Sequence, residues 1–339
     1  NVQIVTEAQF YTQLENNAVG CNLCPRNCII EAGKFGNCKA RRNRNGTLIS
    51  EVYGKIAALN SDPVEKKPLY HFFPGNEILS IGTTGCNLHC VFCQNFALSQ
   101  CDIRQPVSVK GFTPEELAAL SLKKKNNLGV AFTYNEPTVN YEFMIRTAEL
   151  VKQNNQKTVV VSNGYINPDP LKILLKNIDA FNIDLKAFDD NFYKKYSKAS
   201  LDPVKNAIKI IAKSGKHFEI TNLVIPTLND DEFEFAEMCD WIAKETGRDT
   251  VLHLSRFFPR YELDQYPTPP ETLFTLFDIA REKLNYVYIG NMATELHSST
   301  YCPTCKTLLI ERTYYNTRKH AISPEGKCTK CGKLVINEI

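Results

Sequence analysis

Residues 85–95 read Gly-Cys-Asn-Leu-His-Cys-Val-Phe-Cys-Gln-Asn. This stretch places three cysteines, Cys86, Cys90 and Cys93, in one short segment. An apolar run at residues 78–81 and a Gly-Thr-Thr-Gly breaker precede it, which predicts a loop after a β-strand and not one face of a core helix. Four-iron clusters normally take four cysteine thiolates, so a local set of three either has a distant fourth ligand or leaves one iron free to bind another molecule. The segment therefore predicts an open iron–sulfur site.

From residue 78 onward, short β-branched runs alternate with helical stretches, which is typical of a parallel sheet with crossover helices. The strands are expected at residues 78–81, 129–134, 158–162, 180–186, 218–224, 250–256 and 286–290. Helices are expected from Thr113-Pro114, which offers an N-cap and an N1 proline, and over residues 230–244 and 270–283. We expect an α/β fold, a partial (β/α)6 TIM-like barrel. A doubly wound open sheet is the alternative that this pattern leaves open.

Alternation along the strands predicts a polar interior. One face of residues 181–186 is Phe, Ile and Leu, whereas the other face carries Asn182, Asp184 and Lys186. The same alternation recurs later at Glu219, Thr221, His253 and Ser255. A closed eight-stranded barrel fills its interior with branched apolar layers, so these polar side chains indicate a water-filled interior instead.

Further polar residues end the earlier strands. Glu136 lies at the end of the second strand, before a helix-starting proline, and Ser162 and Asn163 end the third. Catalytic residues gather at the C-terminal ends of barrel strands, so these positions are candidate site residues. Two simpler explanations stay open: Ser-Asn-Gly at residues 162–164 also favours a plain turn, and His253 could be a hydrogen-bonded core histidine.

Eight other cysteines form two sets of four that flank the barrel. The C-terminal set predicts a zinc ribbon, because two C-x2-C knuckles with zinc-ligand spacing comprise Cys302, Cys305, Cys328 and Cys331. The N-terminal set comprises Cys21, Cys24, Cys28 and Cys38. Its four thiols suit either a second iron–sulfur cluster for electron supply or a closed zinc site, and the spacing does not decide between them.

We therefore expect three parts: a Cys-rich N-terminal extension over residues 1–75, a core barrel over 76–298 and a zinc-ribbon-like tail over 299–339. The composition, with 43% hydrophobic and 23% charged residues, is close to the average of soluble proteins. No apolar run approaches the roughly 20 residues of a membrane helix. The first residues show no basic-then-apolar signal peptide, so a cytoplasmic location is expected.

The C-x3-C-x2-C spacing, with Phe92 before its last cysteine, resembles the radical S-adenosylmethionine (SAM) enzymes. Over nearly the whole chain, residues 21–28, 62–72, 253–257 and the knuckle at 302–305 are similar to the AmmeMemoRadiSam-system radical SAM enzymes. These are relatives of the pyruvate formate-lyase activating enzymes. The motifs of this group do not name a substrate.

The resemblance implies a [4Fe-4S] cluster on the three central cysteines, with SAM bound to its free iron. One electron from the cluster would yield a 5′-deoxyadenosyl radical that abstracts hydrogen from a substrate. It further implies that Glu136 accepts a hydrogen bond from the SAM amino group. The other cofactor-binding or substrate-binding residues expected are Phe92, Ser162, Asn163, Asp184, Lys186 and His253.

The implied partners are a one-electron donor such as flavodoxin or ferredoxin, together with Memo-like and AMMECR-like proteins. Two other functions stay open. One is an activating enzyme that installs a glycyl radical on a partner enzyme. The other is a metal-stabilised nucleic-acid binder without catalysis, since phosphates and bases could contact the basic, tyrosine-bearing tail at Tyr301, Arg312, Tyr314, Tyr315, Arg318 and Lys319.

Overall fold

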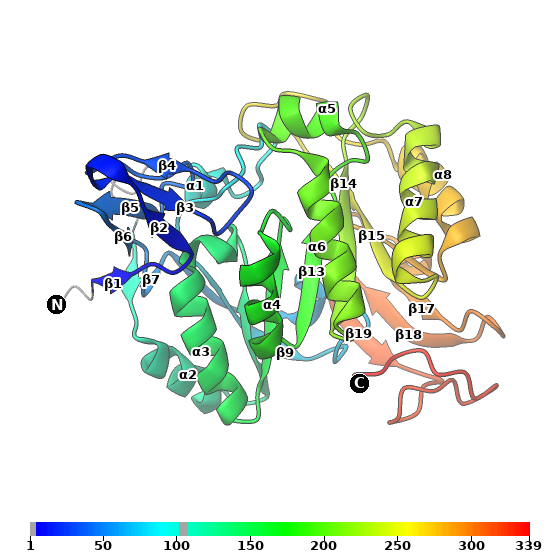
Figure 1. Ribbon diagram of the computed structural model, residues 1–339. Coiled ribbons are helices and arrows are strands. Elements are labelled where there is room, and N and C mark those ends of the chain that lie inside the picture. Colours follow the sequence, from blue (N-terminus) through cyan, green and yellow to red (C-terminus); the bar gives the residue numbers. More distant parts are fainter. Residues whose placement is uncertain (1–4, 102–107) are drawn as a thin grey trace.

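A mixed eight-stranded sheet organises the computed structural model, which describes residues 5–101 and 108–339 (Figure 1). Its strand order is β16-β15-β14-β13-β12-β11-β9-β8. Its parallel strands are β9 (Glu77–Gly82), β11 (Asn127–Phe132), β12 (Lys157–Ser162), β13 (Ala180–Asp184), β14 (His217–Val224), β15 (Val251–Arg256) and β16 (Tyr286–Gly290). All of these were predicted. The eighth strand, β8 (Ala58–Pro63), pairs antiparallel to β9 and was not predicted.

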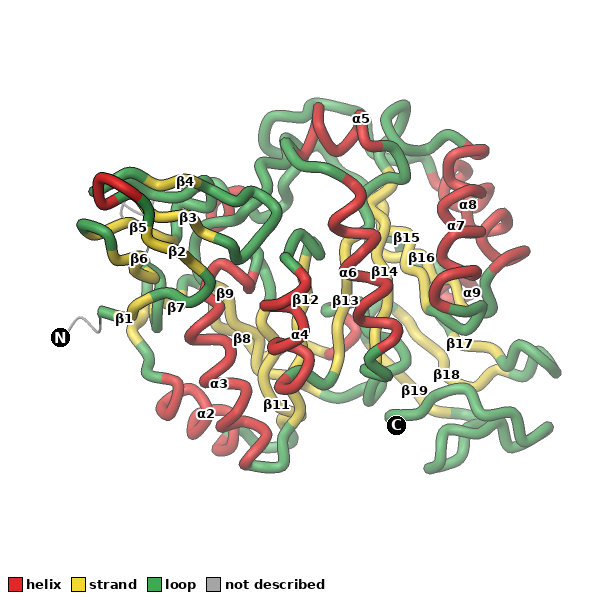
Figure 2. Tube along the Cα trace, in the orientation of Figure 1, coloured by secondary structure: helices red, strands yellow, loops and turns green. Residues whose placement is uncertain are grey.

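One layer of helices covers the outer face of the sheet (Figure 2). These helices are α2 (Pro114–Lys123), α3 (Tyr141–Gln153), α4 (Pro168–Asn177), α6 (Leu201–Lys213), α7 (Glu232–Thr246) and α8 (Pro270–Lys283). Each contacts the next in the series. A doubly wound sheet would carry helices on both faces, so the one-sided layer confirms the incomplete barrel. In the part of the chain that the structure describes, no helix has the length and apolar character needed to cross a bilayer.

Local capping explains where the predicted helices begin. The Thr113 hydroxyl accepts a hydrogen bond from Glu116 N at 3.1 Å, and the Glu116 carboxylate accepts one from Thr113 N at 2.8 Å. This capping box and the proline at N1 start α2 where the sequence predicts it. Helix α7 starts two residues later than predicted, because the Asp231 carboxylate accepts hydrogen bonds from the amides of Phe233 and Glu234 and so serves as its N-cap.

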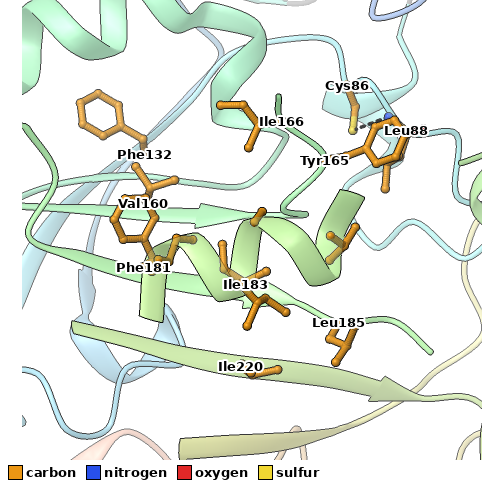
Figure 3. Packing of buried hydrophobic residues seen from close by; sticks show 14 of the residues in the cluster. Cys86, Leu88, Phe132, Val160, Tyr165, Ile166, Phe181, Ile183, Leu185 and Ile220 are labelled. Carbon is orange, nitrogen blue, oxygen red and sulfur yellow. Dashed lines mark hydrogen bonds between the residues drawn. The ribbon is translucent and has the colours of Figure 1, made fainter. Parts of the chain in front are cut away.

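The apolar face of β13 packs into the core. Phe181, Ile183 and Leu185 are buried and lie in one cluster with Val160 and Ile220 (Figure 3). The same cluster includes apolar residues of α6, so this face of the sheet points toward the helices. The alternation predicted for β13 is therefore confirmed on its apolar side.

The two extensions are small antiparallel sheets. The N-terminal part forms the sheets β1-β6-β5 and β2-β3-β4, and the C-terminal part forms β17-β18-β19. Their bounds are β1 (Thr6–Glu7), β2 (Tyr11–Gln13), β3 (Val19–Cys21), β4 (Ile29–Ile30), β5 (Arg41–Arg44), β6 (Thr47–Ser50), β17 (Thr300–Tyr301), β18 (Leu308–Thr313) and β19 (Asn316–Lys319). Strand β8 lies within the range expected for the N-terminal extension, yet it pairs in the main sheet.

The remaining elements are short. They are the paired strands β7 (Lys55–Ile56) and β10 (Lys110–Gly111), the helical turns η1 (Glu15–Asn17), η2 (Val64–Lys66) and η3 (Pro137–Asn140), the short helices α1 (Phe96–Ser99), α5 (Asp190–Phe192) and α9 (Glu295–Ser298), and the π-helical turn η4 (Tyr193–Ser197). Turn η3 follows β11 and η4 lies after β13, so both sit beside strand ends.

Arg312 corrects one part of the nucleic-acid hypothesis. This residue was counted among the basic side chains of the tail, but it is fully buried on β18. Its guanidinium donates to the carbonyl of Tyr70 at 2.7 Å and to the Thr300 hydroxyl at 2.7 Å. Arg312 is therefore wrong as a phosphate contact, because it fastens the tail to the barrel.

Candidate functional site

A cleft of about 670 Å³ opens at the C-terminal ends of the parallel strands. Nine of the ten predicted cluster and cofactor residues line it, namely Cys86, Cys90, Phe92, Cys93, Glu136, Ser162, Asn163, Asp184 and Lys186. Asn182, Thr221 and Ser255 line it as well, so the upper parts of the polar faces of β13, β14 and β15 point into the cleft, whereas Glu219 on β14 is buried below it. The exception is His253.

The loop that carries the three cysteines is anchored by its backbone. The amides of His89 and Val91 donate to the carbonyls of Ser197 and Tyr196 in η4, each at 3.0 Å. The amide of Cys93 donates to the carbonyl of Cys90 at 3.2 Å, which closes a turn between two of the thiols. The loop therefore holds all three cysteines against one end of the cleft.

The thiols sit among buried hydrogen-bond donors. Cys86 Sγ accepts from Leu88 N at 3.4 Å and from Asn163 Nδ2 at 3.7 Å. Burial raises the pKa of the Cys86 and Cys90 thiols, so metal binding must displace their protons. Three thiols with no fourth cysteine among the described residues lining the cleft suit a four-iron cluster that keeps one iron open.

Glu136 is buried at the start of η3 and held by three neighbours. Its carboxylate accepts hydrogen bonds from the hydroxyls of Thr138 at 2.8 Å and Ser162 at 3.0 Å, and from Asn163 N at 2.8 Å. Burial raises the pKa of Glu136, although these hydrogen bonds oppose the rise. A cationic ligand group in the cleft would favour the ionised carboxylate.

Asn135 is a positioning residue that the sequence reasoning missed. Its Nδ2 donates to the carbonyl of Gly85 at 2.8 Å, and its Oδ1 accepts from Thr83 N at 3.1 Å. The side chain thereby joins the end of β11 to the start of the cysteine loop. The sequence did offer one signal for this role, because Asn135 directly precedes Glu136 in the polar segment that follows β11.

Asp184 and Lys186 line the cleft and form an ion pair, in which Lys186 Nζ lies 3.1 Å from Asp184 Oδ2. The Lys186 ammonium also lies 5.8 Å from the centre of the Phe92 ring. Burial alone would lower the pKa of Lys186, but the charges of Asp184 and Cys90 raise it by more. Lys186 is therefore a cation at neutral pH and faces the cysteine loop.

A second group of polar residues that the sequence reasoning missed also lines the cleft, on the side formed by β8 and the segment that follows it. Asp62 at the end of β8 pairs with the buried Lys67 at 2.8 Å and accepts a hydrogen bond from the Tyr134 hydroxyl at 2.6 Å. Burial raises the pKa of Asp62, but the hydrogen bonds from Lys67 and Tyr134 outweigh it and lower the pKa to about 2. Tyr315 from the C-terminal extension completes this wall. The sequence carried no signal for these contacts beyond the resemblance over residues 62–72.

His253 lies below the cleft and does not line it. It is buried, and its Nε2 lies 2.6 Å from the Glu219 carboxylate. Burial raises the pKa of Glu219, but hydrogen bonds to His217 and His253 hold it well below the usual range. His253 precedes Ser255, a cleft residue, by two positions, which places it roughly 7 Å deeper along β15. The structure thus does not support a cofactor contact at His253 and matches the alternative of a hydrogen-bonded core histidine.

His71 in the same buried region predicts a pH-dependent stability. Its Nε2 lies 2.6 Å from the Tyr288 hydroxyl, and burial lowers its pKa from 6.5 to about 3. The His71 imidazole therefore binds a proton near pH 6.5 in the unfolded chain, whereas in the folded chain it binds one only when the pH falls to about 3. The free energy of unfolding should fall with decreasing pH, by up to about 1.4 kcal/mol per pH unit from this group.

Urea unfolding measured between about pH 7 and 5 tests this expectation, because carboxylates titrate mostly below that window. The variant His71→Gln should show a shallower dependence on pH than the parent chain. The control His320→Gln changes an exposed histidine and should leave the slope nearly intact. Equal slopes for the parent and His71→Gln would contradict the assignment.

The four C-terminal cysteines come together as predicted. Their ligand atoms lie within 4.8 Å of one another, and the Sγ atoms of Cys302 and Cys331 are 3.5 Å apart. The amides of Lys306 and Gly332 donate to the carbonyls of Cys302 and Cys328, which forms the two knuckle turns. Four thiols in this arrangement suit a tetrahedral metal ion.

The four N-terminal cysteines also meet, in a different manner. Cys21, Cys24, Cys28 and Cys38 line one small cavity beside the cysteine loop, together with Arg26, Arg41 and Asn87. They do not belong to the group of closely spaced metal-ligating atoms found in the described residues.

Comparisons with known proteins agree with this geometry. The family model of the Radical SAM superfamily matches residues 80–239. The chain is 43% identical to an uncharacterized protein of Methanocaldococcus jannaschii, over 97% of this chain and 98% of that protein. It is 26% identical to the pyruvate formate-lyase-activating enzyme of Clostridium pasteurianum, over 47% of this chain and 66% of that enzyme. The structure of a radical SAM methyltransferase from Sphaerobacter thermophilus matches with a TM-score of 0.51 at 14% identity, covering 70% of this chain and 71% of that one, and shows the fold alone.

Proposed function

This chain belongs to the radical SAM superfamily, whose members are enzymes that use SAM, and we propose on that premise that its cleft binds a [4Fe-4S] cluster and SAM. Cys86, Cys90 and Cys93 would hold the cluster. When bound, the reduced cluster supplies the electron that breaks the sulfonium C–S bond of SAM and yields a 5′-deoxyadenosyl radical for hydrogen abstraction. The observation that carries the proposal is the set of three thiols at the strand-end cleft, where no fourth cysteine is found among the lining residues that the structure describes.

The remaining cleft residues would bind and orient SAM. Glu136 is the acceptor for the methionyl ammonium, because its carboxylate lies in the cleft and is held by Ser162 and Asn163. The polar side chains at the end of β12 would face the ribose. Lys186 supplies a fixed positive charge for a carboxylate of the cofactor or of the substrate.

The direct test is anaerobic turnover. Reconstituted protein with dithionite and SAM is expected to form 5′-deoxyadenosine and methionine, which chromatography with mass detection would quantify. Protein without iron and sulfide is the control. Product at the level of that control would contradict the proposal.

The variant Glu136→Gln is expected to weaken SAM binding by about ten- to a hundredfold, since a hydrogen bond to a charged group contributes about 1.5–3 kcal/mol. The amide also replaces one acceptor oxygen with a donor that faces Asn163 N. Anaerobic titration of the reconstituted variant with SAM measures this loss. The control Glu149→Gln alters a half-buried carboxylate on α3 that does not line the cleft, and it should leave affinity unchanged. Unchanged affinity in Glu136→Gln would remove this residue from the SAM site.

A second candidate function is the activation of a glycyl radical enzyme, favoured by the similarity to the activating enzyme of Clostridium pasteurianum. The same cleft chemistry would then abstract hydrogen from a glycine of the partner. Electron paramagnetic resonance of a candidate partner incubated with this protein and SAM tests it. A glycyl radical signal supports the activase, and a small-molecule product in place of that signal supports the first candidate.

We further propose that the chain is an AmmeMemoRadiSam-system enzyme of the cytoplasm. Its partners would be a flavodoxin or ferredoxin and Memo-like and AMMECR-like proteins. The support is the resemblance of residues 21–28 and 62–72 to that group.

The four closely spaced C-terminal thiols support zinc in the tail.

A further inference from the structure

The N-terminal cavity is built for a metal–thiolate centre. Its four cysteines share the cavity with apolar side chains that exclude water, among them Leu23, Ile30 and Val139. The cysteines come from the end of β3, the loop before β4 and the turn before β5, so the small sheets of the extension bring them together. Their spacing left zinc and an iron–sulfur cluster as alternatives.

Two other cysteine sets in the same chain help to separate these alternatives. The C-terminal thiols lie within 4.8 Å of one another, as four ligands about 2.3 Å from one zinc ion require. Neither the three cleft cysteines nor the four N-terminal ones form such a group in the described residues. A four-iron cluster is larger than a single ion and holds its thiolates farther apart. The N-terminal set therefore resembles the cleft set, and not the zinc knuckle.

Two arginines, Arg26 and Arg41, line the cavity, and among the described residues no carboxylate lines it. The Arg41 guanidinium pairs on one side with the buried Glu142 carboxylate, which lies outside the cavity lining. Arg41 is buried, and its Nη1 lies 3.7 Å from Cys21 Sγ. Arg26 Nη2 and Arg41 Nε are buried without a hydrogen-bond partner, an arrangement that is unfavourable unless a bound group supplies acceptors. A centre with four thiolates would supply both negative charge and sulfur acceptors.

This cavity adjoins the cleft cysteines on both sides of Cys86. A Cβ atom added to Gly85 would lie 2.5 Å from the carbonyl oxygen of Cys38, so the two backbones touch there. On the other side, the carbonyl of Asn87 accepts a hydrogen bond from Arg26 Nε at 2.8 Å. Asn87 lines the N-terminal cavity and follows Cys86 directly in the chain.

The Asn87 side chain completes the connection. It hydrogen-bonds the Cys24 thiol, and its Oδ1 accepts from Asn163 Nδ2 at 2.9 Å. Asn163 in turn contacts Cys86 Sγ. One residue thus touches a cysteine of the N-terminal set and is covalently joined to a cysteine of the cleft set.

We propose that Cys21, Cys24, Cys28 and Cys38 hold a second [4Fe-4S] cluster, which passes one electron to the cleft cluster through the Cys86-Asn87 segment. This inference rests on the proposed function of the cleft. A one-electron protein donor of the flavodoxin or ferredoxin class reduces the relay cluster. The relay cluster returns to its oxidised state as the cleft cluster is reduced, and that electron enters the C–S bond of SAM on cleavage. No atom or proton moves in the relay step.

Metal content tests the assignment of the cluster. The parent chain should hold about eight iron atoms, and the triple variant Cys86→Ala/Cys90→Ala/Cys93→Ala about four, in a Mössbauer spectrum typical of a cubane. The double variant Cys24→Ala/Cys38→Ala should also hold about four, now on the cleft cysteines. A triple variant with no iron and with a second zinc ion would overturn the inference.

The choice of electron donor tests the relay. With reduced flavodoxin, SAM cleavage by Cys24→Ala/Cys38→Ala should fall by at least about tenfold, whereas dithionite reaches the open cleft directly and should support turnover close to that of the parent. The control Cys239→Ala changes a buried cysteine outside all three sets and should retain both activities. Full activity of the double variant with flavodoxin would contradict the relay.

A milder variant covers the case in which the double variant does not fold. Arg26→Gln removes a half-buried cation from the cavity lining, so the reduction potential of the relay cluster should become more negative while that of the cleft cluster stays constant. Redox titration followed by electron paramagnetic resonance measures both. An unchanged relay potential contradicts the placement of a cluster beside Arg26. Failure of the parent chain to cleave SAM with dithionite, by contrast, counts against the proposed function itself.

Discussion

Replacing Cys90 with alanine is expected to abolish SAM cleavage. A cluster held by the two remaining cleft thiols would have two open irons and would be lost or held loosely, because cluster binding depends on every thiolate. Cys90 also sits in the centre of the anchored loop, where Cys93 N donates to its carbonyl. The fall should reach the detection limit, at least about a thousandfold, since no other group in the site replaces the reduced cluster.

The measurement is 5′-deoxyadenosine formed per chain under anaerobic conditions with dithionite. The control is Cys239→Ala, which shortens a buried cysteine on α7 far along the chain from the loop. Circular dichroism should show that both variants retain the secondary structure of the parent. Retained turnover in Cys90→Ala would mean that the catalytic cluster lies on another cysteine set.

If the C-terminal thiols bind zinc as proposed, removing one of them is expected to unfold the C-terminal extension. Cys302 is fully buried at the knuckle, and Cys302→Ala would leave three thiols for the ion. Structural zinc contributes about 10–16 kcal/mol to the folding of comparable small units, which is far more than the few apolar side chains around Ile310 and Ile336 provide. The tail would then release Arg312 from its bonds to the barrel.

Zinc content and limited proteolysis measure this effect. The parent chain should hold one zinc ion in the tail, and Cys302→Ala should hold none there and become cleavable within residues 299–339, whereas the barrel stays resistant. The matched control is Lys330→Ala, which alters the exposed loop between Cys328 and Cys331 without removing a ligand. A protease-resistant tail in Cys302→Ala would show that the extension does not depend on the metal. Loss of Tyr315 from the cleft wall should also raise KM for the substrate.

Much of the fold was predictable because its signals are local. Alternation along residues 181–186 determined which side chains of β13 face the core, and the spacing of the cleft cysteines predicts an iron–sulfur site. Strand β8 gave no such signal, since its residues 58–63 are mostly small or polar. It becomes a strand by pairing with β9, a contact that no local pattern reports.

The candidate site likewise has some features that local sequence predicts and others that only tertiary contacts decide. Local spacing predicts Cys86, Cys90 and Cys93 as cluster ligands, because the chemistry of three thiols depends on residues a few positions apart. Tertiary structure alone decided that His253 is buried below the cleft and that Arg312 is buried. Alternation determines the face on which a strand residue lies but not its depth along the strand, and depth depends on packing from distant segments. For the same reason, only the folded chain reveals that Asn87 joins two cysteine sets far apart in the sequence.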